Sequence, residues 1–141
     1  MPYQVTSIRD NYRYTAIVPR RELAYTIIKF LADLGLTLNE FKQVVHDSEL
    51  SPAHILDEAA YLELVEIHPE MDLIYESLCL KNNERMYFHT NWTVSSLNWQ
   101  KMTLALAAYR IEVTTIKSRD ISHSLKTKTP LSDAERAQLD T

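Results

Sequence analysis

The chain has 141 residues, enough for one domain whose core needs neither a disulfide nor a structural metal. Its composition, 45% hydrophobic and 24% charged, is that of a globular protein and excludes disordered and fibrous classes. The formal net charge of −4 is unevenly spread, because residues 40–84 contain eleven carboxylates and only two cations, Lys42 and Lys81. A concentrated field of this kind steers docking partners in a way that scattered charge does not.

Glycine is scarce. The chain has a single glycine, Gly35, where average usage of about 7% would give about ten. Loops that cradle phosphates need several glycines, because their backbone approaches the ligand closely and takes positive φ. Walker-type, dinucleotide-type and kinase-type loops are therefore excluded, as is the nucleophile elbow of the α/β-hydrolases. The only cysteine, Cys79, lies between two leucines and is expected to be buried.

The N-terminus has no basic region followed by an apolar stretch, and the uninterrupted apolar runs are only a few residues long. We therefore expect neither secretion nor a membrane span, and a cytoplasmic location.

The first elements in chain order are a hairpin and a helix. Two runs with strand composition, Tyr3–Arg9 and Tyr12–Val18, are separated by Asp10 and Asn11, which predicts a β-hairpin. Residues 22–34 carry apolar side chains at helical spacing, and Gly35 follows where a left-handed C′ residue is expected.

Three helices are predicted in the middle third. A capping box, Thr37 with Glu40, opens a short helix that ends near residue 46. Ser51 followed by Pro52 starts a second helix over residues 52–67, with apolar residues facing the core at Leu56, Ala59, Ala60, Leu64 and Ile67. Pro69 then begins a third helix, over residues 70–80.

The last third is less regular. Residues 85–92 have strand composition, and residues 97–110 are predicted to be helical. Residues 111–116 fit either a strand or the tail of that helix. We expect one α+β domain over residues 1–125, mostly helical, with a short N-terminal hairpin packed on four or five helices. Residues 126–141 are expected to form a polar tail that frays.

The acidic segment supplies the candidate binding site. Glu63, Glu66 and Glu70 fall at i, i+3 and i+7 without a cation within helical reach, so the sequence accepts like-charge repulsion that a lysine would relieve. We therefore expect a non-enzymatic interaction protein that binds a positively charged protein surface, with inhibition of a nucleic-acid-binding complex as one form of this role. The residues predicted to bind the partner are Asp57, Glu58, Glu63, Glu66, Glu70 and Glu76.

The alternative is a nucleic-acid-binding regulator. Tyr12 and Tyr14 share one face of the predicted hairpin and Arg13 and Thr15 share the other. Arg9, Arg20 and Arg21 lie nearby, and aromatic rings with arginines on a sheet are typical of single-strand binding. The overall acidic balance opposes this interpretation. Cations that would extend the surface lie in the C-terminal stretch, at Arg110, Lys117, Arg119, Lys126 and Lys128.

No catalytic residue, metal site or cofactor is predicted. His54 and Glu58 are four residues apart and Glu66, His68 and Glu70 are clustered, but five scattered histidines produce such pairs by chance. The metal motifs with two histidines or paired Glu-x-x-His are absent. Trp92 is the aromatic residue that we would expect to anchor an interface if it is exposed.

Overall fold

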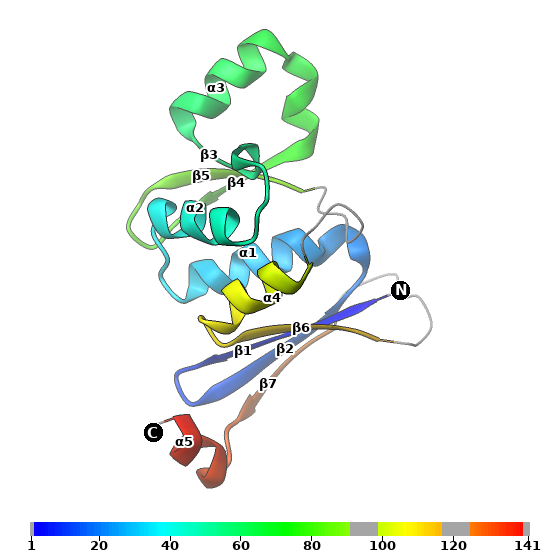
Figure 1. The fold of residues 1–141 in the computed structure, drawn as a ribbon, viewed down its shortest axis with the longest axis vertical. Helices are drawn as coiled ribbons and strands as arrows, with labels where there is room; N and C mark the ends of the chain where they lie inside the picture. Colours follow the sequence, from blue (N-terminus) through cyan, green and yellow to red (C-terminus); the bar gives the residue numbers. More distant parts are fainter. Residues whose placement is uncertain (1, 91–98, 117–124, 140–141) are drawn as a thin grey trace.

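A computed structural model describes residues 2–90, 99–116 and 125–139. Two antiparallel sheets lie in it with helices between them (Figure 1). The large sheet has the strand order β6-β1-β2-β7, with bounds Ile111–Thr115, Tyr3–Arg9, Tyr12–Val18 and Leu125–Pro130. The small sheet has the order β3-β5-β4, with bounds Ile55–Asp57, Arg85–His89 and Tyr75–Cys79.

The helices fill three positions relative to these sheets. Three α-helices lie between the large sheet and the small one: α1 (Leu23–Asp33), α2 (Leu38–Asp47) and α4 (Trp99–Ala107) (Figure 1). On the far side of the small sheet, at one end of the molecule, lie α3 (Glu58–Ile67) and the 3-10 helix η3 (Pro69–Ile74). At the opposite end, α5 (Asp133–Leu139) follows β7. Two further 3-10 turns, η1 (Arg20–Glu22) and η2 (Pro52–His54), precede α1 and β3.

The hairpin and the first two helices form as predicted. Asp10 and Asn11 both have positive φ, 55° and 68°, as the two central residues of a tight hairpin turn of type I′ require. Gly35 follows Leu34, the C-cap of α1, and has φ 91°. The capping box is complete, because the Thr37 hydroxyl accepts from the Glu40 amide while the Glu40 carboxylate accepts from the Thr37 amide.

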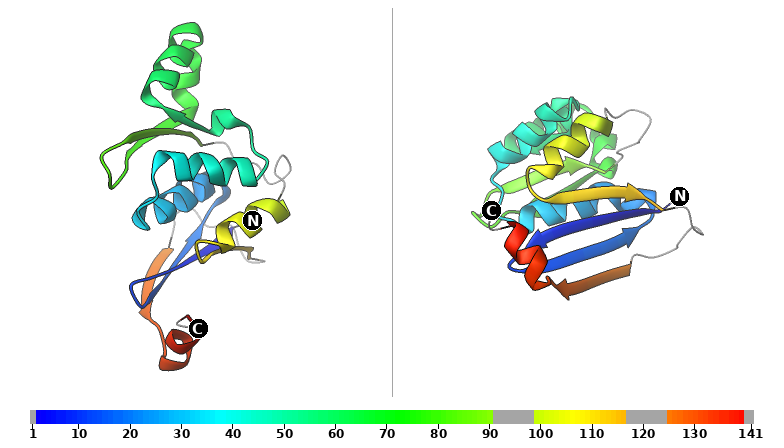
Figure 2. Two further views of the ribbon diagram at one scale, coloured as in Figure 1. Left: turned by 60° about the vertical axis from the view of Figure 1, so that its left-hand side comes forward. Right: turned by 60° about the horizontal axis from the view of Figure 1, so that its bottom comes forward.

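The core lies under one face of the large sheet. Val5, Ala16 and Val113 form a row across β1, β2 and β6 and are fully or almost fully buried, in contact with the layer of helices. Phe88 of the small sheet belongs to the same buried cluster, so the core spans both sheets. Every residue of β7 is exposed, which places this strand beyond the cover of the helices (Figure 2).

The prediction of a mostly helical fold with only an N-terminal hairpin is wrong. Residues 52–57 form η2 and β3 instead of the first turns of a helix, and α3 begins only at Glu58. Residues 75–79 form β4, paired with β5, where the sequence suggested the end of a helix. Pairing between distant segments thus overrides the local helical periodicity.

The C-terminal part contributes further strands. Residues 111–115 form β6, which decides the open choice between strand and helix there. Residues 125–130, expected to belong largely to a polar tail, pair with β2 along their length as β7. Cys79 is exposed on the edge strand β4, not buried as expected. Trp92, Lys117 and Arg119 lie outside the residues that the structure describes.

Among the described residues, no helix combines the length and the apolar character that crossing a bilayer requires.

Candidate functional site

The main candidate site is the arm formed by α3 and η3, residues 58–74, which we call the α3–η3 arm. It extends from the small sheet at one end of the molecule (Figure 1). Tyr61 is its only buried side chain. Three large apolar side chains of the arm are exposed, Leu62 by 56%, Ile67 by 66% and Leu73 by 87%. Exposed apolar residues gathered on one projection are typical of interaction sites.

Contacts at its base fix the start of the arm. Asp57 is the N-cap of α3, and its carboxylate accepts a hydrogen bond from the Ala60 amide at 2.8 Å. The same carboxylate lies 3.9 Å from the Lys42 ammonium on α2. Tyr61 stacks on Tyr87 of β5 and donates a hydrogen bond from its hydroxyl to Asp72 on η3. Tyr61 therefore links α3 to both the small sheet and η3, and two hydrogen bonds from Thr90 to the Ile74 carbonyl hold the end of η3.

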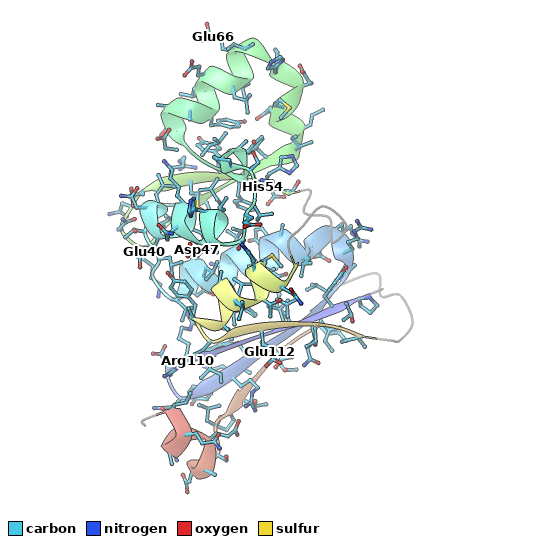
Figure 3. The ribbon with its side chains drawn as sticks, viewed as in Figure 1. Glu40, Asp47, His54, Glu66, Arg110 and Glu112 are labelled. Carbon is cyan, nitrogen blue, oxygen red and sulfur yellow. The ribbon has the colours of Figure 1, made fainter. Side chains whose placement is uncertain are left out.

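The arm is strongly acidic. It contains five carboxylates and neither lysine nor arginine. Within the part of the chain that the structure describes, no cation lies within 4.0 Å of Glu58, Glu63 or Glu66, whereas Glu70 lies 3.5 Å from the His68 ring. Figure 3 shows the Glu66 side chain at the outer end of α3, pointing away from the small sheet. The charge is thus presented to solvent together with the apolar side chains.

The six predicted partner-binding residues fall in three places. The arm holds Glu58, Glu63, Glu66 and Glu70, all of them exposed. The single stripe that the sequence suggested is interrupted, because α3 ends at Ile67 and Glu70 belongs to η3. Asp57 lies at the base and caps the helix.

Glu76 lies apart from the arm. It is an exposed residue of β4, paired in register with Phe88, whose ring lies 6.2 Å from that of Tyr25 on α1. Paired residues of adjacent strands point to the same face of a sheet, so Glu76 faces the helical layer. It lines a hollow of about 330 Å³ together with Arg21 and Tyr25.

The exposed apolar residues were missed by sequence reasoning. The helical pattern assigned Ile67 to the core, but Ile67 is 66% exposed at the end of α3. A usable signal is present in the sequence: α3 carries leucine, valine or isoleucine on more than one side, as in Leu62, Leu64 and Val65. A short helix that is apolar all round and also acidic does not have a single core-facing stripe.

A cluster of aromatic and imidazole rings lies at the junction of η2 and the small sheet. The rings of His54 and His89 are 5.4 Å apart, and Tyr75 meets His89 edge-on at 5.4 Å. Burial, and then the neighbouring His54, lower the pKa of His89. The Tyr75 hydroxyl donates to the Ala53 carbonyl at 2.5 Å, and burial raises the pKa of Tyr75. The cluster is a packed part of the fold.

The histidine–carboxylate groups of the sequence are not assembled into a metal site. His54 lies on η2 and Glu58 starts α3, so they do not share one helix. In residues 2–90, 99–116 and 125–139, no group of three or more His, Cys, Asp or Glu side chains is arranged to hold a metal ion.

A cavity of about 650 Å³ lies next to the base of the arm, between α2 and the first turn of α3. Its volume is in the range of pockets that hold small molecules or a partner's side chain. The lining is largely apolar, and Lys42, His46, Glu49 and Asp57 contribute its polar and charged groups. Its apolar members are Val45, Leu50, Pro52, Ile55, Leu56 and Ala60.

Comparison with known proteins gives no match of any kind: no protein-family model, no curated protein and no solved structure matches this chain.

Proposed function

We propose that this protein acts by binding, without catalysis, and that the α3–η3 arm docks on a positively charged protein surface. The observation that carries the proposal is the exposure, on one projection, of Leu62, Ile67 and Leu73 among five carboxylates and no lysine or arginine. A monomer that only needed solubility would gain from interleaved lysines, which relieve repulsion along a helix.

The two kinds of side chain have different roles in this proposal. Carboxylates at the rim steer the encounter and exclude acidic partners, and they contribute more to the association rate than to the final affinity. The exposed apolar side chains supply the buried centre of the interface, where most binding energy resides. The partner would therefore present a shallow apolar groove with lysine and arginine along its border. Proteins that bind nucleic acid carry lysine and arginine at the edges of their binding surfaces in the same way.

The first test is affinity purification of tagged protein from its native host, washed with rising salt and analysed by mass spectrometry. We expect a stoichiometric basic partner that dissociates as salt rises, because screening weakens exposed charge pairs. The triple variant Glu63→Lys/Glu66→Lys/Glu70→Lys should lose this partner. A charge-matched control, Asp47→Lys/Glu112→Lys/Asp133→Lys, changes exposed carboxylates outside the arm and should keep it.

The apolar contribution is tested separately. Leu62→Ser/Leu73→Ser leaves the charge unchanged and should speed dissociation of the purified complex while leaving its association rate nearly constant. Equal binding by the wild type, the charge variant and the serine variant would show that the arm is not the docking surface. Recovery of no protein partner would contradict the proposal as well.

A further inference from the structure

A second surface, at the other end of the molecule, gathers cations and aromatic rings. Tyr14 on β2 is the direct cross-strand partner of Lys128 on β7, and Ala16 is that of Lys126. Paired residues share a face of the sheet, so both lysines lie on the face that also carries Tyr12 and Tyr14. Because the helices do not extend over β7, both lysines are exposed.

The cations of this surface lie against the rings. The Arg9 guanidinium lies 4.5 Å from the centroid of Tyr14, and the Lys128 ammonium lies 4.2 Å from that of Tyr12 and 5.5 Å from that of Tyr14. Arg9 also donates to the Asp33 carbonyl at the end of α1, at 3.0 Å. The guanidinium is thereby held in place by both the sheet and the helix.

A groove of about 220 Å³ runs between β2, β7 and α1 beside these residues. Arg9, Tyr14, Tyr25, Lys29 and Lys126 are among the residues that line it, and we call this surface, with Tyr12 and Lys128, the basic groove. Two of its rings are accessible, Tyr12 by 37% and Tyr25 by 39%.

The basic groove carries an excess of positive charge. Of its four cations, Lys29 pairs with Asp33 at 3.2 Å and Arg9 lies 4.0 Å from the solvent-exposed Asp10. Neither Lys126 nor Lys128 has a carboxylate within 4.0 Å among the described residues. Lysines that have no acidic partner and border aromatic rings present an anion site with stacking surfaces.

The negative net charge does not cancel this site. The α3–η3 arm and β7 lie at opposite ends of the molecule, with the small sheet, the helical layer and the large sheet between them (Figures 1 and 2). Screening at physiological salt limits exposed charges to about 8 Å, so each end presents its own potential to a partner.

We propose that the basic groove binds single-stranded nucleic acid. Lys126 and Lys128 are two residues apart on an extended strand, so their Cα atoms are about 7 Å apart and can contact successive phosphates of one chain. The accessible rings of Tyr12 and Tyr25 offer stacking surfaces that only unpaired bases can use.

The test uses the full-length protein and a fluorescent oligothymidylate of about 15 nucleotides, a length that covers one or two binding sites. Fluorescence anisotropy at low salt should show binding, and the slope of log K against log salt should be about −1.4, as expected for two phosphate contacts on a single strand. A duplex of the same length should compete poorly.

Variants separate the cations from the rings. Lys126→Glu/Lys128→Glu should reduce affinity at least about tenfold, whereas the charge-matched control Arg85→Glu/Lys101→Glu, at exposed positions of β5 and α4, should change it less than about twofold. Tyr12→Ala/Tyr25→Ala should also weaken binding about tenfold, and Tyr12→Phe/Tyr25→Phe should restore it, because the stacking ring is kept.

Three results would overturn the proposal. The first is the absence of an anisotropy change with wild-type protein at low salt. The second is an equal loss of affinity in the groove and control variants, and the third is a duplex that competes as well as the single strand. Circular dichroism of each variant shows whether it is folded, and the phenylalanine pair gives a second measurement with minimal change to packing. The outcome is independent of the proposed docking role, because no arm residue is altered.

Discussion

The ring of Tyr61 on α3 lies parallel to that of Tyr87 on β5, with centroids 3.9 Å apart and planes 4° apart. At its other end, the Tyr61 hydroxyl donates a hydrogen bond to Asp72 on η3. Tyr61 is the one buried side chain of the α3–η3 arm and joins α3 to both η3 and the small sheet, while the Thr90 amide and hydroxyl donate to the Ile74 carbonyl at the end of η3. Substitution of Tyr61 should therefore lower the stability of the arm more than it lowers the stability of the core.

Replacing Tyr61 by alanine should loosen the arm selectively. Loss of the buried ring and of its stacking contact is expected to cost about 3 kcal/mol in the free energy of local opening. Hydrogen exchange should show this loss at amides of α3 and η3 and little change in α1 or β1. Tyr61→Phe keeps the stack and removes only the hydrogen bond to Asp72, so its cost should be about 1 kcal/mol. A uniform loss of protection across the chain would contradict this account.

Ser48→Ala should stabilise the protein. Ser48 is completely buried at the end of α2, and its hydroxyl is the buried side-chain polar atom without a hydrogen-bond partner among the described residues. An unsatisfied buried group costs about 1–3 kcal/mol, and alanine removes it with little change in volume. We expect urea denaturation to show a gain of about 1 kcal/mol in the free energy of unfolding, with an unchanged m-value. A loss of stability would indicate that the hydroxyl has a partner.

Gly35→Ala should destabilise the protein through the backbone alone. Gly35 has φ 91°, a backbone conformation that is strained for any residue with a β-carbon. The space around it is open, because the nearest atom to an added Cβ is the Lys81 side-chain carbon Cδ at 4.0 Å. The expected loss in thermal or urea unfolding is about 1–2 kcal/mol. Gly35→Asn should cost less, because asparagine tolerates the left-handed region. Equal losses for alanine and asparagine would point to a steric cause instead.

Stability should fall below neutral pH because of His89. Burial and the neighbouring His54 lower the pKa of His89 in the folded state, so the unfolded chain takes up the proton first. The contribution of neutral His89 to the free energy of unfolding is fully present above pH 6.5, the ordinary pKa of histidine. It is lost as the pH falls toward the lowered pKa of His89 in the folded state. Urea unfolding at about pH 7.5 and about pH 5.5 should show a smaller difference for His89→Gln than for the wild type. His46→Gln, at an exposed position, is the matched control and should keep the wild-type difference.

Local signals in the sequence were sufficient where the structure depends on neighbours along the chain. Asp10 and Asn11 adopt the turn that their composition indicates, and Thr37 and Glu40 satisfy each other's amides as the capping box requires. Both features are decided within four residues, so no distant contact can easily override them.

Distant pairing decided the parts that were predicted wrongly. Tyr75 and its neighbours join β5 in the small sheet, although their spacing also suits a helix. Lys126 and Lys128 alternate with threonines, a polar pattern that predicts a tail when the sequence is considered alone. In the structure this segment forms a strand because it pairs with β2. The acidic character of the α3–η3 arm could be predicted from the charge pattern of the sequence alone. The exposure of its apolar side chains could not be predicted, because the exposure of Ile67 and Leu73 depends on where α3 ends and how η3 turns.

The strand order of the large sheet has a consequence for biosynthesis. Both neighbours of the N-terminal hairpin, β6 and β7, come from the last third of the chain, roughly 100 residues later. At a translation rate of about 5–20 residues per second, the hairpin has two unpaired edges for about 5–20 s. Open strand edges recruit other chains, so this interval is the period of greatest risk for misassembly. Nascent chains truncated before Ile111 should therefore aggregate or recruit chaperones more than chains that extend through Pro130.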